Sequence, residues 1–329
     1  MEDKKRWFGI PHRYFVLLFI VLGYFAARAY PPLQPHVQLP AESIAHISEN
    51  FDFTNTLFAT ILADLLLIWL AFKVRGAVKS GSLVPKGISG AVEAFLEGLY
   101  NLTESTAGKW AKRIFPYFAT ITLLVLVVNW MELIPGVDSI GVFDSHHVHI
   151  AGADEHADPF GDHGPCTKTS FLGMALVGGS DSACASAVVP FVRVASTDLN
   201  FTAALAVISV VMTQVIGLQA LGGSYFKKFW NVSTLFKVPV FGAIDFAVGL
   251  LEVVAEFAKI LSFSFRLFGN IFAGSVLLFV IGSLVPVFAQ SVFLMLEFFV
   301  GLIQAIVFGM LTMTFMAQAT HSHGDDDHH

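Results

Sequence analysis

Six polar residues recur along one stretch of an otherwise strongly apolar sequence. They are Asp245, Glu252, Glu256, Lys259, Arg266 and Asn270. If the stretch is one α-helix, a rotation of about 100° per residue places all six within an arc of roughly 80°. Ionisable side chains inside a membrane are costly unless they line water or face a partner charge. We therefore predict that this face of the helix handles ions or protons.

Arg266 is the residue for which this inference is strongest. It lies deep in the apolar stretch, between Phe265 and Leu267, and arginine cannot shed its charge to escape the membrane. For Glu256 and Lys259, a solvated pair near one end of the helix remains an open alternative.

The composition indicates that a bilayer is the solvent for most of the chain. Of 329 residues, 55% are hydrophobic and only 13% are charged, about half the charge of an average soluble domain. The mean hydropathy is +0.69. No basic patch interleaved with exposed aromatic residues indicates binding to nucleic acid.

Six apolar segments set the expected architecture. They span residues 14–27, 57–72, 117–134, 199–221, 241–283 and 287–318. The fifth is about twice as long as a spanning helix needs to be, so it must tilt strongly or cross the interior against other protein. We predict an all-α integral membrane fold with five to six hydrophobic helices. The last two form a long, strongly tilted hairpin that turns near Gly282 and Pro286.

The domain boundaries follow from these segments. Residues 1–30 are either a signal peptide or an extra anchor, since basic residues precede a short apolar run. Residues 31–320 form the membrane domain, and 321–329 are a tail rich in His and Asp. Between the second and third segments, Phe95, Leu99 and Leu102 recur at helical spacing, which predicts an amphipathic helix on the membrane surface.

The basic residues predict the orientation of the chain. They gather in the loops after the second and fourth segments, which should therefore be cytoplasmic. The loop at 137–194 is then extracytoplasmic and the C-terminus cytoplasmic. Cys166 and Cys184 share that outer loop, so we predict a disulfide between them.

Further polar residues fall at matching depths in other segments. A turn near Pro286 brings Arg266 opposite roughly Gln304, and Ser275 opposite roughly Glu297. Toward the outer side, the third segment carries Asn129 and Glu132, and the fourth begins with Asp198 and Asn200. Together with Glu297 these side chains could line a path for water from outside. A role of Asp198 or Asn200 as a helix cap stays open.

These residues resemble subunit a of the F-type ATP synthases. The resemblance rests on the run from Ser264 to Asn270, which contains Arg266, and on Glu297 and Gln304 in the last segment. Asn129 to Pro135, Asp198 to Asn200, and Glu252 match other positions of that family. It covers residues 57–318, except the outer loop.

The resemblance implies a non-catalytic, proton-translocating subunit in the bacterial plasma membrane that needs no cofactor. Its partners would be a ring of c subunits, the b subunits of the peripheral stalk, other ATP synthase subunits and the lipid bilayer. Arg266, supported by Gln304, would separate two half-channels. The family's outer path implies Glu297, Asn270, Glu132, Asn129, Asp198 and Asn200, and its inner path implies Glu252. Ser275 stands where many relatives have a titratable residue.

Two other functions are compatible with parts of the sequence. An ion-coupled secondary transporter would require repeats and discontinuous helices, which the sequence does not indicate. A haem- or quinone-binding anchor would require intramembrane histidines, and residues 198–318 contain none. The histidines of the outer loop match no metal-ligand spacing, and we interpret them as a solvated polar loop.

Overall fold

A computed structural model describes residues 6–7, 10–11, 41, 43–48, 51–79, 87–131, 133–134, 141–143, 167–171, 174–178, 188–223, 225, 239–284 and 288–321. The chain divides into two compact units. The first comprises Met1–Asn55, Glu132–Arg193 and Phe272–Val300, and the second comprises Thr56–Met131, Val194–Ile271 and Gly301–His329. Cys166, Cys184, Glu132 and the first apolar segment lie outside the described residues.

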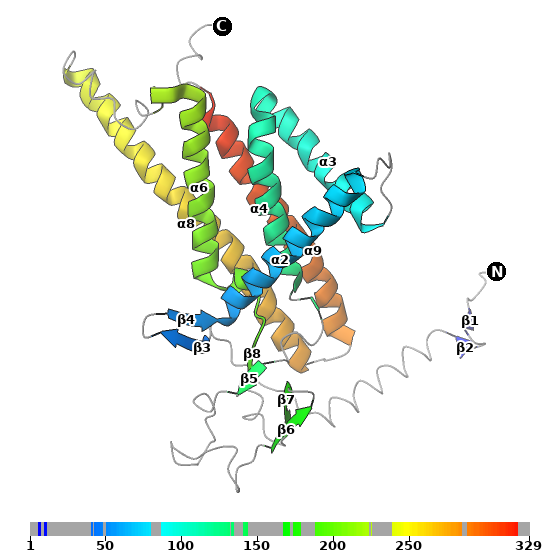
Figure 1. Cartoon of the computed structure of the whole chain (residues 1–329). Coiled ribbons are helices and arrows are strands. Elements are labelled where there is room, and N and C mark those ends of the chain that lie inside the picture. Colours follow the sequence, from blue (N-terminus) through cyan, green and yellow to red (C-terminus); the bar gives the residue numbers. More distant parts are fainter. Residues whose placement is uncertain are drawn as a thin grey trace, which may run out of the picture. The chain divides into compact units, whose positions relative to one another are not determined.

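The second unit is built from long helices (Figure 1). They are α2 (Asn55–Lys79), α3 (Ile88–Ala107), α4 (Ala111–Met131), α6 (Leu199–Leu221), most of α8 (Pro239–Leu284) and the C-terminal part of α9 (Phe288–Ala319). The short helix η1 (Gly108–Trp110) joins α3 to α4, and η4 (Ala195–Thr197) precedes α6. The predicted all-α membrane architecture is confirmed.

The core of this unit is formed by residues from four helices. Leu99 of α3, Ile114 and Phe118 of α4, Ile216 of α6 and Met313 of α9 are all nearly inaccessible and belong to one apolar cluster. In the same region Gly309 allows α9 to approach α4 closely. A Cβ added at Gly309 would overlap Thr122 and the ring of Phe118.

Most other large apolar side chains point outward, as expected where lipid or another membrane subunit covers the surface. On α2 the small residues Ala59 and Ala63 are buried, whereas Leu65 and Phe72 are 57% and 68% exposed. Small residues permit close helix packing in a membrane. Four helical stretches in the described part of the chain are long and apolar enough to cross a bilayer.

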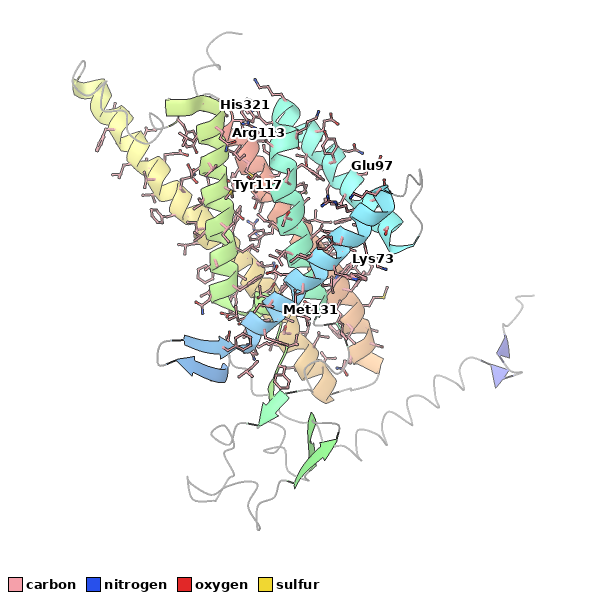
Figure 2. The ribbon with its side chains drawn as sticks, viewed as in Figure 1. Lys73, Glu97, Arg113, Tyr117, Met131 and His321 are labelled. Carbon is pink, nitrogen blue, oxygen red and sulfur yellow. The ribbon has the colours of Figure 1, made fainter. Side chains whose placement is uncertain are left out.

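Aromatic and basic residues lie together toward the ends of these helices. Lys73 lies 5.0 Å from the centre of the Trp69 ring, and the Arg113 guanidinium lies 5.5 Å from the centre of the Trp110 ring. Such pairs are typical of the membrane–water interface. Figure 2 places Arg113 and His321 at the same end of the unit, away from Met131 at the other end of α4.

The predicted amphipathic helix exists as α3. Its charged side chains, including Glu97, are exposed (Figure 2). Its apolar side chains Phe95, Leu99 and Leu102 pack into the core cluster beside α4. Helical periodicity identified the apolar face, but it cannot distinguish a protein partner from a membrane surface.

The first unit contains four small antiparallel strand pairs and the facing parts of α8 and α9. The strands β1 (Arg6–Trp7) and β2 (Ile10–Pro11) pair, as do β3 (Ser43–Ser48) and β4 (Phe51–Thr54). In the region of the predicted outer loop, β5 (Gly141–Phe143) pairs with β8 (Val188–Pro190), and β6 (Thr167–Phe171) pairs with β7 (Met174–Gly178).

Candidate functional site

The predicted polar face lies on one uninterrupted helix. Helix α8 has 46 residues, which agrees with the length read from the sequence. Its polar arc runs along the boundary between a buried and an exposed face. Glu256 is buried, Glu252 is half-buried, and Arg266 and Asn270 are exposed. The polar arc is therefore covered by other parts of the chain near Glu256 and exposed further along the helix, at Arg266 and Asn270.

Arg266 lies on the open side and has no charged partner in the described part of the chain. It makes no hydrogen bond or ion pair there, and its neighbour Phe265 is 56% exposed. Leu267, on the other side of the helix, is only 1% exposed. The helix is thus fixed by its apolar face while the guanidinium points away from this chain's own core.

Helix α9 runs antiparallel to α8 within the second unit. The rings of Phe263 and Phe308 have centroids 5.3 Å apart. Arg266 lies three residues after Phe263 on α8, and Ala305 lies three residues before Phe308 on α9. In antiparallel helices this brings Arg266 level with Ala305, next to Gln304. The centroid of the Phe263 ring also lies 5.6 Å from that of Phe315, so these contacts place Arg266 and Gln304 at roughly the same level, and their pairing stays a prediction. Gln304 is half-buried.

In the first unit, the carboxylate of Glu297 is seated against a glycine of α8. Glu297 is 6% exposed, and a Cβ added at Gly274 would overlap its carboxylate group. Its Oε1 is buried without a hydrogen-bond partner among the described residues. A buried polar oxygen without a partner is costly, so it is a place for a proton, a water molecule or another chain's donor. The sequence predicted that Ser275 lies opposite Glu297. In the structure the close contact of Glu297 is with Gly274, one residue earlier.

Asn129 belongs to a buried hydrogen-bond network in the second unit. Its amide nitrogen donates to the carbonyl of Gly301 at 3.2 Å, and its amide oxygen accepts from the Ser196 hydroxyl at 2.7 Å. Asn129 is 3% exposed and Ser196 is fully buried. The network ties α4 to α9 and to η4, so it positions the segment that leads into α6.

Asp198 acts as the N-cap of α6. Its Oδ1 accepts from the backbone N–H of Asn200 at 2.9 Å, and its Oδ2 accepts from the Thr56 hydroxyl at 3.0 Å. The capping alternative is therefore correct for Asp198, which is also buried. The residue Asn200 is exposed. Ser196, which bonds to Asn129, precedes Asp198 by only two residues. Asn129 and Asp198 are therefore linked through the short segment 196–198.

A second polar cluster involves α6, α8 and the residues after α6. The Lys259 ammonium lies 2.9 Å from Glu256 Oε1 and 4.8 Å from the centre of the Phe315 ring. The Tyr225 hydroxyl donates to Gln214 Oε1 at 2.6 Å. Burial, and then the charges of Glu256 and Glu252, raise the pKa of Tyr225 to about 12, so its hydroxyl remains a donor at physiological pH.

Sequence reasoning missed several residues of these networks. Thr56, Ser196, Gln214 and Tyr225 have polar side chains that no periodic pattern singles out, because their roles depend on contacts over long sequence separations. No group of three or more His, Cys, Asp or Glu that could hold a metal ion occurs within the described ranges.

The chain is similar in sequence to known proteins. Residues 56–317 match the family described as ATP synthase A chain. The chain is 29% identical over 282 residues to ATP synthase subunit a of Mycobacterium ulcerans, covering 84% of this chain and 90% of the relative. It is 25% identical over 260 residues to ATP synthase subunit a of Moorella thermoacetica, covering 79% of this chain and 88% of the relative.

The helices, their apolar surfaces and the polar face of α8 define a membrane protein with an ionisable stripe. Since the family match extends over most of its length, the chain belongs to the ATP synthase A chain family.

Proposed function

We propose that this chain is the non-catalytic, proton-translocating stator subunit of a rotary ATP synthase in the bacterial plasma membrane. The single observation that carries the proposal is Arg266, a permanent charge on the long apolar helix α8 that finds no counter-charge within the described part of its own chain. Because an isolated charge in a membrane is costly, we infer that another molecule supplies the partner of Arg266. A ring of c subunits, each with one membrane carboxylate, supplies such a partner.

The exposed apolar surface around Arg266 is consistent with that partner. Leu261 and Phe265 of α8 are 58% and 56% exposed, and Ile303 of α9 is 54% exposed. A rotating ring needs a surface that it can slide along, and apolar side chains form no directional bonds that would hold it. The charge of Arg266 would then be the one strong attraction on this face.

The charge would perform two tasks. At an effective dielectric constant of about 20, two opposite unit charges 4 Å apart attract by about 4 kcal/mol before desolvation is subtracted. Arg266 would therefore favour the ionised form of an arriving ring carboxylate, so that its proton is released. The same positive charge would repel a proton that crosses directly between the two half-channels.

The outer half-channel is assigned to Glu297, Asn129, Asp198 and Asn200, with Glu132 and Asn270 as further members. Support comes from Glu297, whose Oε1 is buried without a partner in the described residues. Asp198 and Asn129 also have structural roles, because they form hydrogen bonds with the backbone of Asn200 and Gly301. Ser275, which is half-buried, cannot titrate, so we assign the main proton relay on this side to Glu297.

The inner half-channel is assigned to Glu252, next to Glu256 and Lys259. The proposed orientation puts this side in the cytoplasm together with the C-terminus, while residues 137–194 lie outside. This orientation is supported by the basic residues between positions 222 and 238. It is also supported by the position of Arg113 and His321 at one end of the second unit (Figure 2).

The proposed partners are the c ring, the b subunits of the peripheral stalk and other ATP synthase subunits. A secondary transporter is disfavoured, because α8 and α9 are continuous over 46 and 32 residues and no broken helix forms a substrate site in them. The experiment is copurification of the native complex, followed by proton-driven ATP synthesis with Arg266→Ala. Isolation of the chain without c subunits would contradict the proposal.

A further inference from the structure

Asp64 lies in the middle of an otherwise apolar helix. The part of α2 that is long and apolar enough to cross a membrane, Asn55–Gly76, has 22 residues. Asp64 follows Asn55 by nine residues, which is roughly 14 Å along the helix axis. The nearest charged residue of α2 is Lys73, nine residues further on. The aspartate side chain has a single methylene group, so it cannot reach either end of this span.

The side chain of Asp64 points away from the core of its own chain. It is exposed, whereas Ala59 and Ala63 on another side of α2 are buried. Within the described part of the chain, Asp64 makes no hydrogen bond and no ion pair. The carboxylate is therefore the one polar group on a surface that the described residues leave uncovered.

Four large apolar side chains share this side of α2 with Asp64. They are between 42% and 68% exposed, and they belong to Ile61, Leu65, Ile68 and Phe72. At about 100° per residue, the four side chains and Asp64 fall within an arc of roughly 100°. We call these five residues the Asp64 face. It is a wide apolar surface with a carboxylate at its edge.

Neither lipid nor water is a favourable cover for the Asp64 face. An ionised carboxylate in hydrocarbon is costly, and the large apolar side chains around Asp64 are costly to expose to water. Ionisable residues of membrane helices almost always face the interior of a helix bundle, where they pair with another group. Because Asp64 faces outward from its own helices, such an interior requires another chain.

We propose that the Asp64 face binds a membrane-spanning helix of another subunit, and that this helix carries a lysine or an arginine at the level of Asp64. The cation supplies the charge that the described part of this chain does not offer. Apolar side chains of the two helices exclude water from the pair, which strengthens the attraction. The pair fixes the level and the rotation of the two helices. The inference goes beyond the proposed function, because it uses no group of the assigned proton path.

The first test measures assembly of the native complex. Asp64→Asn keeps the shape and removes the charge, and Asp64→Leu removes the polar group. Each should lower the amount of one other subunit that copurifies in detergent by at least about tenfold, because one charge of a buried pair is left alone. Asp64→Glu keeps the charge and should retain most of that subunit. Thr60→Val is the matched control on α2, since the Thr60 hydroxyl bonds to the backbone of Thr56 in the same helix, and copurification should stay unchanged.

The leucine variant separates loss of the partner from loss of the fold. Leucine is far more favourable than aspartate in the centre of a membrane helix, so Asp64→Leu cannot fail because α2 does not insert. If lipid covers the face, all subunits copurify as before with Asp64→Leu, and that result would overturn the proposal. Full copurification with Asp64→Asn would also overturn it, because the partner would then not depend on charge.

The second test identifies the partner helix. The photoreactive residue p-benzoylphenylalanine replaces Ile68, one turn from Asp64 on the same face, and the complex is irradiated in its native membrane. Mass spectrometry should find a crosslink to a membrane helix of another subunit, with a lysine or an arginine within one turn of the crosslinked position. A crosslinked helix without a cation, a crosslink to residues 1–40 of the same chain, or crosslinks to lipid alone would contradict the proposal.

The two hypotheses fail separately, because neither test needs proton flow. The expected crosslink together with normal ATP synthesis in Arg266→Ala would refute the proposed function and leave this contact. Unchanged assembly in Asp64→Leu together with no synthesis in Arg266→Ala would refute the contact alone.

Discussion

The close contact between Gly274 and Glu297 makes a single methyl group a sensitive probe of the proposed outer half-channel. In Gly274→Ala the added Cβ would lie 2.5 Å from Cδ of Glu297, whereas ordinary contact begins at 3.4 Å. The carboxylate must therefore move by about 1 Å, and overpacking of this kind costs about 1–3 kcal/mol. The helix itself gains up to about 1 kcal/mol from the replacement of glycine.

The expected result is a functional loss in a complex that still assembles. A displacement of about 1 Å of a group that must meet a proton can reduce a rate by up to about 100-fold. We expect proton-driven ATP synthesis in inverted vesicles to fall by about 10- to 100-fold. Gly98→Ala is the matched control, because nothing lies within 4 Å of the added Cβ on α3, and it should synthesise ATP normally.

A second variant separates displacement of the carboxylate from general damage. Glu297→Asp in the Gly274→Ala background shortens the side chain by one methylene and should recover part of the lost synthesis. Wild-type synthesis in Gly274→Ala alone would refute the reasoning, because the carboxylate could then move without functional cost.

The remaining predictions concern the outer relay, the buried network and the outer loop. Glu297→Gln should slow proton-driven ATP synthesis severely while assembly is retained, as judged by copurified subunits; near-normal synthesis would refute the relay. Asn129→Leu leaves the Ser196 hydroxyl without its acceptor, and each buried group left unpaired costs about 1–3 kcal/mol, so the detergent-solubilised complex should dissociate at a lower temperature. Mass spectrometry of the non-reduced protein should detect a Cys166–Cys184 disulfide, and two free thiols in protein kept oxidised throughout would exclude it.

The sequence predicted the polar arc of α8 and the approximate pairing with α9 because both depend on regular geometry. A helix repeats every 3.6 residues, and only three residues separate the end of α8 from the start of α9, which leaves little freedom in the alignment of the two helices. The close contact of Glu297 is with Gly274, one residue before the position that the sequence predicted. This difference decides which position is sensitive to substitution, although it hardly changes the level of the site along the helices.

Other features depend on the path of the chain in space. Nothing local to Tyr225 indicates that its ring turns back toward Gln214. The sequence likewise left open whether Asp198 is a cap or part of a path, and its bonds to Asn200 and Thr56 give it the capping role. Such contacts are selected by tertiary packing, which a single sequence does not display.

The central claim concerns the charge of Arg266. Lysine keeps the charge in water but can lose its proton when it is buried, and it lacks the planar guanidinium. Both Arg266→Ala and Arg266→Lys should therefore fail to couple proton flow to synthesis.

The most direct measurement is ATP synthesis together with proton flux in vesicles that carry the assembled Arg266→Ala complex. The account predicts no coupled synthesis, with either blocked flux or a proton leak that produces no ATP. Coupled synthesis at the wild-type rate would contradict it.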